Sequence, residues 1–194
     1  RNLFMLGGAE RRVVVQSPDG ADIAGAEIAV FRNGPVDYLT LEKRSFEFET
    51  YPVPARIRLP EKRDVYNVRT GDHLGWTDQI AVDLTGLGCF VYALLPYQDK
   101  GMAVTIPGST KRGGEITVTA KLRTNIDGPG PHTIRVDVFQ PNGERLWPMY
   151  KLETKAGKAA VSVPVALNEA TGKWKVAVTD VTTGKQVTRH VTVQ

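Results

Sequence analysis

The sequence is poor in the residues that hold small disulfide-linked or metal-bound domains together. Its 194 residues include one Cys and three His, so no internal disulfide can form and a His/Cys zinc centre would need carboxylate ligands as well. No apolar run approaches the roughly 20 residues that span a bilayer, and no segment has the spacing of a glycine-rich phosphate loop or a nucleophile elbow. These absences exclude a disulfide scaffold, a zinc finger and a membrane-inserted protein, and we expect no metal and no cofactor.

Charge is divided unevenly between two halves of the chain. Residues 1–99 carry 11 Lys and Arg against 14 Asp and Glu, whereas residues 100–194 carry 14 against 7. A break in composition of this kind is typical of two domains, and Pro96 and Gly101 bracket a polar step at the boundary. We therefore predict one domain over 1–99 and a second over 100–194. The cations of the basic half are spread among Thr and Val positions without a basic cluster, so we expect no nucleic-acid partner.

Apolar residues of the second half alternate with polar ones, which is the period of a β-strand with one wet face. The clearest alternating sets are Ile116/Val118/Ala120/Leu122, Ile134/Val136/Val138, Val161/Val163/Val165 and Trp174/Val176/Val178. Three further candidates lie at 102–106, 146–153 and 186–193. About seven strands in a domain of this length are typical of an immunoglobulin-like or fibronectin-like sandwich.

The first half is less regular but also favours strands. Its candidates are 26–31, 37–41, 46–48, 55–59, 64–68, 79–84 and 89–95. Prolines between them suit the ends and edges of short sandwich strands. The segment 89–95 is nearly continuously apolar, which predicts a central strand covered on both faces. The predicted fold is therefore all-β, with two tandem antiparallel β-sandwiches, the second immunoglobulin-like or fibronectin-like.

Two turn phrases occur once in each half. VYNVRTG at 65–71 parallels VTDVTTG at 178–184, and QSPDG at 16–20 parallels QPNG at 140–143. Each phrase ends in a Gly that follows polar residues, which is the chemistry of a tight turn with a positive φ. An old duplication and shared turn chemistry both explain the parallel, and shared chemistry is the simpler of the two.

Groups that could carry catalysis are scattered along the chain. Glu47 and Glu49 lie two residues apart, and a glycosidase needs two carboxylates in one cleft. Their alternation with phenylalanines is, however, what an ordinary strand produces. Cys89 lies inside an apolar run, so we expect a buried side chain and no nucleophile. A free-standing small hydrolase is thus disfavoured, and we predict that the chain is not an enzyme.

The aromatic residues are more informative, because sugar-binding modules stack pyranose rings on exposed Trp and Tyr side chains. Trp174 is in phase with the core-facing valines of its strand, so we place it in the core. Trp147 follows a hairpin tip and is either exposed or packed against a neighbouring domain. For Trp76, which follows a turn, packing on the first sandwich is favoured over a sugar platform. If a sugar is bound, we predict that Trp147 and Tyr150 stack on it, with Trp76 as the next candidate.

Several short phrases carry a family resemblance: VYNVRTGDHLG at 65–75, VYALLPY at 91–97, FRNG at 31–34, KRGG at 111–114 and GKWKV at 172–176. Together they resemble the C-terminal, non-catalytic β-domains of large bacterial β-galactosidase-like glycoside hydrolases. The resemblance carries over no catalytic residue and implies a secreted or periplasmic location. It also implies two partners, the catalytic domain of a parent polypeptide and a polysaccharide. The opening at Arg1, without Met or a signal sequence, is what we expect of a piece of a longer polypeptide.

We therefore predict a non-catalytic accessory region of a larger carbohydrate-active enzyme, structural and carbohydrate-binding. The alternative is a cell-envelope adhesion or protein-interaction module of immunoglobulin-like domains, which would engage protein through sheet edges or loops. Partner binding that survives the loss of exposed aromatic residues would indicate this alternative.

Overall fold

The computed structural model of this chain describes residues 12–23, 25–43, 52–85, 88–147 and 149–194. Its regular structure is all β, as predicted, and no helix is present in the described ranges, hence none that could cross a membrane. The strands are β1 (Val14–Gln16), β2 (Ala26–Asn33), β3 (Val36–Lys43), β4 (Pro54–Asn67), β5 (His73–Asp83), β6 (Cys89–Leu95), β7 (Asp99–Thr105), β8 (Ser109–Thr110), β9 (Glu115–Thr124), β10 (Thr133–Phe139), β11 (Tyr150–Glu153), β12 (Lys158–Pro164), β13 (Gly172–Asp180) and β14 (Gln186–Val193). Pairing is antiparallel except between β14 and the short β8.

Strands β1–β6 form one sheet in the order β1-β4-β6-β3-β2, with β5 also against β4. The long β4 pairs along one edge with β5, at 54–58 and again at 63–66. Along its other edge it pairs with β1 at 56–58 and with β6 at 64–67. A bulge at 59–62, which contains Pro60, shifts its register with β5, and bulges bend strands. The sequence predicted two separate strands here. The bend folds the sheet over one apolar core, whose members include Val15, Leu39, Leu41, Ile57, Ile80 and Leu94.

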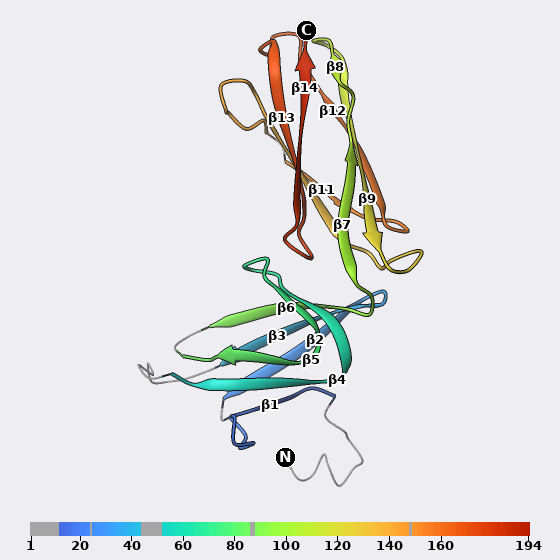
Figure 1. Cartoon of the computed structure of the whole chain (residues 1–194). Coiled ribbons are helices and arrows are strands. Elements are labelled where there is room, and N and C mark those ends of the chain that lie inside the picture. The colour runs from blue at the N-terminus through green and yellow to red at the C-terminus, as the bar shows by residue number, and fades with distance from the viewer. Residues whose placement is uncertain (1–11, 24, 44–51, 86–87, 148) are drawn as a thin grey trace.

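Strands β7–β14 form a sandwich of two sheets, β11-β10-β13-β14-β8 and β12-β9-β7. The predicted alternation is confirmed, since β9 reads exposed and buried in strict turn from Glu115 to Arg123. Its inward residues share one core with Trp174, which is fully buried as expected. We call residues 12–95 of the first sheet the lower unit and residues 99–194 the upper unit, after their places in Figure 1.

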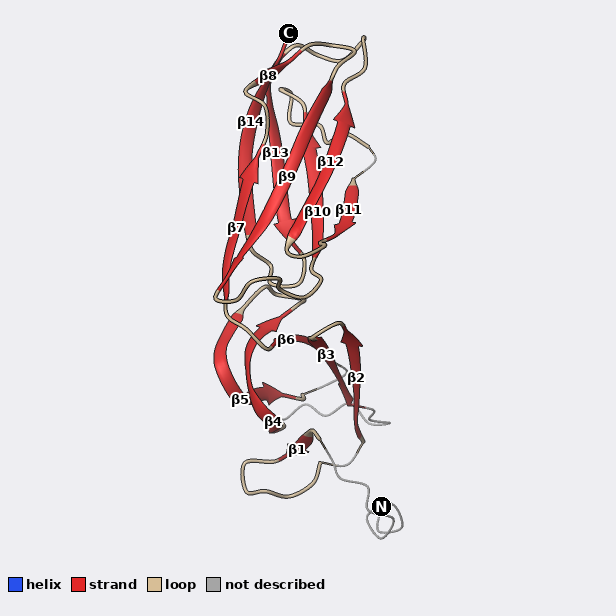
Figure 2. Cartoon of the chain, turned by 90° about the vertical axis from the view of Figure 1, so that its right-hand side faces the viewer, coloured by secondary structure: helices blue, strands red, loops and turns tan. Residues whose placement is uncertain are grey.

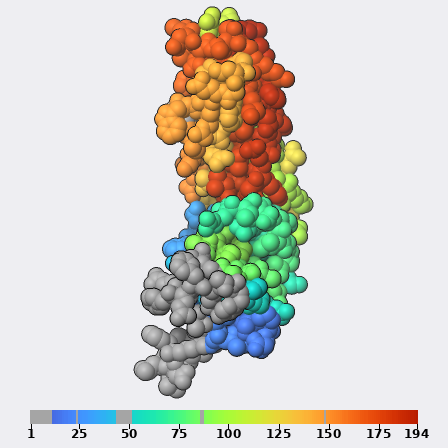
Figure 3. All heavy atoms as spheres, turned by 90° about the vertical axis from the view of Figure 1, so that its left-hand side faces the viewer, coloured from blue at the N-terminus to red at the C-terminus, as the bar shows by residue number. Residues whose placement is uncertain are grey.

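The upper unit stands on one face of the lower sheet. Its strands run along the long axis of the molecule, whereas those of the lower unit lie across it (Figures 1 and 2), and the two units meet as packed surfaces (Figure 3). A second apolar cluster lies on this face of the lower sheet, opposite its main core: Val36, Tyr66, Ala93, Leu95 and Tyr97. The lower sheet is therefore buried on both faces where the upper unit covers it.

Strand β6 shows how far that double burial extends. Tyr92 and Leu94 face the main core of the lower unit, and Ala93 and Leu95 face the second cluster, which confirms the predicted central strand for this part. Cys89 is exposed, so the prediction of a buried thiol was wrong. The reason is its position as the first residue of β6, outside the doubly covered end of the strand. The candidate strand 46–48, with Glu47 and Glu49, lies outside the described residues.

Candidate functional site

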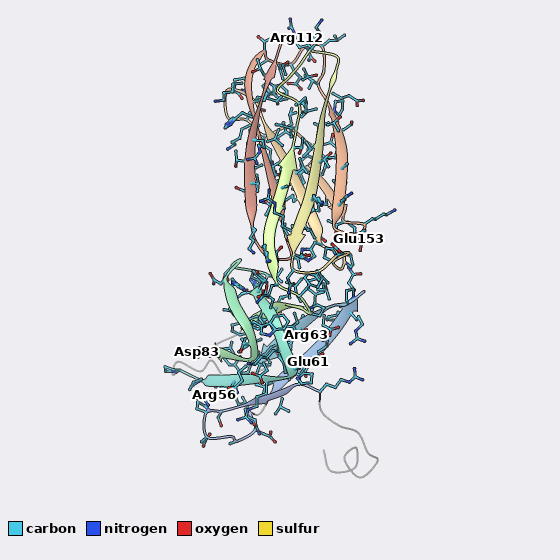
Figure 4. The ribbon with its side chains drawn as sticks, turned by 45° about the vertical axis from the view of Figure 1, so that its right-hand side comes forward. Arg56, Glu61, Arg63, Asp83, Arg112 and Glu153 are labelled. Atoms are coloured by element: carbon cyan, nitrogen blue, oxygen red, sulfur yellow. The ribbon has the colours of Figure 1, made fainter. Side chains whose placement is uncertain are left out.

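A hollow of about 250 Å³ on the side of the upper unit brings together Trp147 and Tyr150. Its other lining residues are Gly113, Gly114, Glu115, Leu146, Val163, Pro164, Val165, Ala166 and Glu169. Because β11 and β12 are edge strands of different sheets, the hollow opens over the seam between the two layers. The hollow adjoins Arg112 near the far end of the molecule, whereas Glu153 marks the end that meets the lower unit (Figure 4).

Trp147 and Tyr150 are held differently at this hollow. Trp147 is 78% exposed, so within this chain its side chain is not packed against the other unit. The residue before it is anchored, because Leu146 N–H donates to the carbonyl of Val138 at 2.8 Å. Tyr150 pairs in register with Val136 in the sheet and packs partly against the core. A fixed tyrosine and a solvent-facing tryptophan thus line the same hollow. Leu167, which follows the lining residue Ala166 in sequence, is 77% exposed.

Four polar groups at the hollow make no hydrogen bond or ion pair with any residue that the structure describes. They are the carboxylates of Glu115 and Glu169, the hydroxyl of Tyr150 and the indole N–H of Trp147. Each can therefore bond to water or to a ligand at no cost in internal bonds. An apolar surface with a few free polar groups around it is the usual composition of a small-ligand site.

Trp76 lies elsewhere. It belongs to β5 in the lower unit, where it is 43% exposed, and Leu74, two residues before it, is 41% exposed. It does not line the hollow of the upper unit. The structure thus brings together two of the three predicted stacking residues and places the third on the other unit.

The contact between the units is built on the two parallel turn phrases. In each phrase the closing glycine donates to the residue four positions back, Gly71 to the Asn67 carbonyl and Gly184 to the Asp180 carbonyl, both at 2.8 Å. The two glycines face each other across the junction. A Cβ atom on Gly184 would lie 2.5 Å from the Cα of Gly71, so this contact needs glycine.

A buried chain of side chains crosses the same junction. Tyr97 Oη and His132 Nε2 lie 3.0 Å apart, and His132 Nδ1 lies 2.7 Å from Asp180 Oδ2. All three residues are at most 2% exposed, so no substrate can reach them despite a geometry that resembles a catalytic triad. Burial is the main cause of the raised pKa of Tyr97. No local sequence pattern predicts this network, because its bonded side chains lie 35 and 48 residues apart.

Lys185 adds a charged bond at the junction. Its ammonium donates to Asp99 Oδ2 at 2.6 Å and to the hydroxyl of Tyr66 at 3.1 Å. The Asp99 carboxylate is fully buried. Asp64 accepts from the backbone N–H of Asp99 at 3.0 Å and from Tyr66 at 3.2 Å. Burial and then the charge of Asp64 raise the pKa of Tyr66, which keeps its hydroxyl protonated.

A larger hollow, of about 590 Å³, lies in the lower unit between the edge strand β2 and the bulge of β4. Two of its arginines already have partners. Arg32 Nε donates to Asp37 Oδ1 at 2.9 Å, and Arg63 pairs with Glu61 beside the bulge (Figure 4). In the described ranges, no group of three or more His, Cys, Asp or Glu side chains could hold a metal ion.

Comparison with known proteins gives distant likenesses of fold. No protein-family profile matches the chain, and no curated protein matches it. A β-glucosidase from Listeria innocua in complex with glucose matches 50% of this chain and 16% of its own, at 16% identity and a TM-score of 0.34. A Bacteroides uniformis β-glucuronidase matches 84% of this chain and 26% of its own, at 12% identity and a TM-score of 0.29.

A chimeric titin Z1Z2-Z1Z2 tandem matches 93% of this chain and 82% of its own, at 14% identity and a TM-score of 0.27. The chain spans less than a third of the length of either hydrolase. Likenesses at these identities and scores assign neither a family nor an activity to the chain.

Proposed function

We propose that this chain is a non-catalytic accessory region of a larger carbohydrate-active enzyme, and that its upper unit binds a glycan at the hollow beside Trp147. The observation that carries the glycan site is the exposed indole of Trp147 next to Tyr150, over a hollow with four free polar groups. Exposed aromatic faces stack on the apolar faces of sugar rings, and polar groups around them accept or donate bonds to hydroxyls. The parent enzyme and a secreted or periplasmic location rest on the sequence phrases at 65–75 and 91–97.

The structural part of the proposal is supported by the junction. Apolar burial, a backbone contact between two glycines and polar bonds such as those of Lys185 to Tyr66 and of the Asp99 N–H to Asp64 all act across it. A joint with these features keeps the two units in a fixed orientation, since rotation would expose the apolar cluster and break paired buried groups. The chain would then hold the glycan hollow at a set distance from whatever the lower unit contacts, the catalytic domain of the parent polypeptide in our proposal.

The test is affinity electrophoresis of the full chain in gels that contain one soluble polysaccharide each, with Trp fluorescence in parallel. We expect retardation by at least one polysaccharide, and a loss of about 1–3 kcal/mol of binding in Trp147→Ala. The matched control is Trp76→Ala, which removes an exposed tryptophan from the other unit and should bind as the wild type does. Unchanged retardation of Trp147→Ala would contradict the site. If no gel retards the wild type, only the structural role of the chain would remain.

A second candidate function is supported by a different observation. Strand β2 is an edge of the lower sheet, and Val30 and Phe31 on it are 46% and 59% exposed. A long exposed edge with apolar residues is suited to pairing with a strand of another protein. In this case the chain would be a protein-interaction module of the cell envelope.

Binding of the labelled chain to cell-envelope preparations separates the two functions. Phe31→Lys places a charge on the edge strand, which natural proteins use to block strand pairing. Binding that falls in Phe31→Lys and persists in Trp147→Ala would support the interaction module. The opposite pattern supports the glycan site.

A further inference from the structure

The charge at the Trp147 hollow is opposite to the charge of the unit that carries it. Residues 99–194 hold 14 Lys and Arg against 8 Asp and Glu, so the upper unit as a whole attracts anions. The charged side chains that line the hollow are, however, two carboxylates, Glu115 and Glu169, and no Lys or Arg lines it. The charge of the lining is therefore opposite in sign to the net charge of the unit at the place where we propose that a sugar stacks.

Neither carboxylate has an ion-pair partner among the described residues. Glu115 is exposed at the first position of β9, and Glu169 is half-buried in the connection between β12 and β13. As noted above, no described residue makes a hydrogen bond or ion pair with either side chain. Both remain acceptors for hydroxyl groups, which is what an uncharged sugar ring presents.

From this charge pattern we infer that the hollow selects uncharged glycans and rejects those that carry carboxylates; this rests on the proposed glycan function. A uronate ring stacked between Trp147 and Tyr150 would bring a negative charge close to Glu115 and Glu169. Two like charges about 4 Å apart repel by roughly 1 kcal/mol even in water. The hydroxymethyl group of a neutral hexose, by contrast, donates a hydrogen bond to the same carboxylates.

The volume of the hollow fits this view. At about 250 Å³ it lies below the roughly 300–1,000 Å³ of sites that enclose a drug-sized ligand. It therefore accommodates a short stretch of an exposed polysaccharide chain at its surface. On such a chain a substituent at C6 recurs on every ring, so a C6 carboxylate is present near the hollow in every register in which the chain binds.

The test compares one soluble β-glucan with a sample of the same polymer oxidised at C6, so that the backbone is the same and a hydroxymethyl donor is replaced by a charged carboxylate. We expect the full chain to bind the oxidised polymer about tenfold more weakly at low salt, and we expect 1 M NaCl to reduce the difference. The double variant Glu115→Gln/Glu169→Gln should bind both polymers with similar affinity. A control variant, Asp127→Asn/Glu144→Gln, makes the same change in net charge at exposed positions outside the lining and should keep the preference.

The outcomes separate the inference from the function on which it rests. If neither this polymer nor any other glycan is bound, the proposed glycan site fails and the selectivity fails with it. If Trp147→Ala abolishes binding but both forms of the polymer bind equally to the wild type, the glycan site stands and the selectivity is wrong. A preference that persists unchanged in the Glu115→Gln/Glu169→Gln variant would also overturn it, because the discrimination would then arise elsewhere.

Discussion

The two units of this chain reach a buried core by different routes. The upper unit closes two sheets over a core of its own that includes Trp174. The lower unit bends one sheet over a core, and leaves a second apolar cluster with Val36, Tyr66 and Leu95 on the outer face of that sheet. The upper unit covers that face. The comparison indicates that the upper unit can fold without the lower unit, whereas the lower unit depends on the upper unit to cover its second apolar cluster.

Separating the units should have the largest effect. A fragment of residues 99–194 is expected to fold cooperatively, since it keeps its core and both Asp99 and Lys185. A fragment of residues 1–98 would expose Val36, Tyr66 and Leu95, and uncovering three such side chains costs roughly 5–9 kcal/mol, as much as the stability of many domains. Circular dichroism with urea unfolding of each fragment tests this. A stable fragment 1–98 would show that the lower unit also folds without its neighbour, which would contradict the comparison.

The next effect concerns the charged bond at the junction. Lys185→Ala leaves the fully buried Asp99 carboxylate without its partner, which should lower the free energy of unfolding by about 3 kcal/mol. Arg32→Ala is the control, because it breaks an ion pair at a 64% exposed arginine and should cost less than about 1 kcal/mol. Urea unfolding of both variants measures the difference, and equal losses would show that Lys185 acts as a surface charge.

The glycine contact allows a closely matched pair. Gly184→Ala combines a φ of +75° with a clash against Gly71, for an expected loss of about 2–4 kcal/mol. Gly143→Ala has a similar φ of +85° but open space around it, so strain alone should cost about 1 kcal/mol. Thermal and urea unfolding measure the loss of stability in each variant, and the difference between the two losses is the cost of the clash. Equal losses would mean that the turns do not press on each other in solution.

The smallest effect is expected at alkaline pH, where the free energy of unfolding should fall because Tyr66 and Tyr97 are buried where the two units meet. Burial raises the pKa of Tyr66 and Tyr97 above the ordinary value of about 10, so the unfolded chain loses these protons first as pH rises. Their contribution to stability is therefore full well below pH 10 and falls as the pH rises through 10, by roughly 0.7 kcal/mol for each tyrosine between pH 9.5 and 10.5. Urea unfolding across this range should show the loss in the full chain. The loss should be smaller in the fragment 99–194, which contains only Tyr150.

Local pattern was enough to predict the upper unit from the sequence. Strict alternation in segments such as 115–122 identifies both the strand and its buried face, because side chains of a strand point to opposite faces in turn. The burial of Trp174 followed from the same phase. The exposed face of Trp147 could not be derived in this way, since it lies in a connection where no period applies.

In the lower unit the same reasoning reached the strands but missed what joins them. Candidates at 55–59 and 64–68 proved to be one strand, because the bulge at Pro60 bends β4 without ending it. Cys89 was misplaced because an apolar run does not show where the covering unit stops. The parallel turn phrases at 65–71 and 178–184 were visible, but their contact across the junction depends on the tertiary arrangement.

The most direct test of the account compares the full chain with the fragment 99–194 in binding to one glycan that retards the wild type. Titration calorimetry or Trp fluorescence gives both affinities under the same conditions. Because the hollow is built entirely from residues 113–169, we expect the two Kd values to agree within twofold, and Trp147→Ala to weaken both by tenfold or more. A folded fragment that fails to bind, or binding by the full chain that Trp147→Ala leaves intact, would contradict the account.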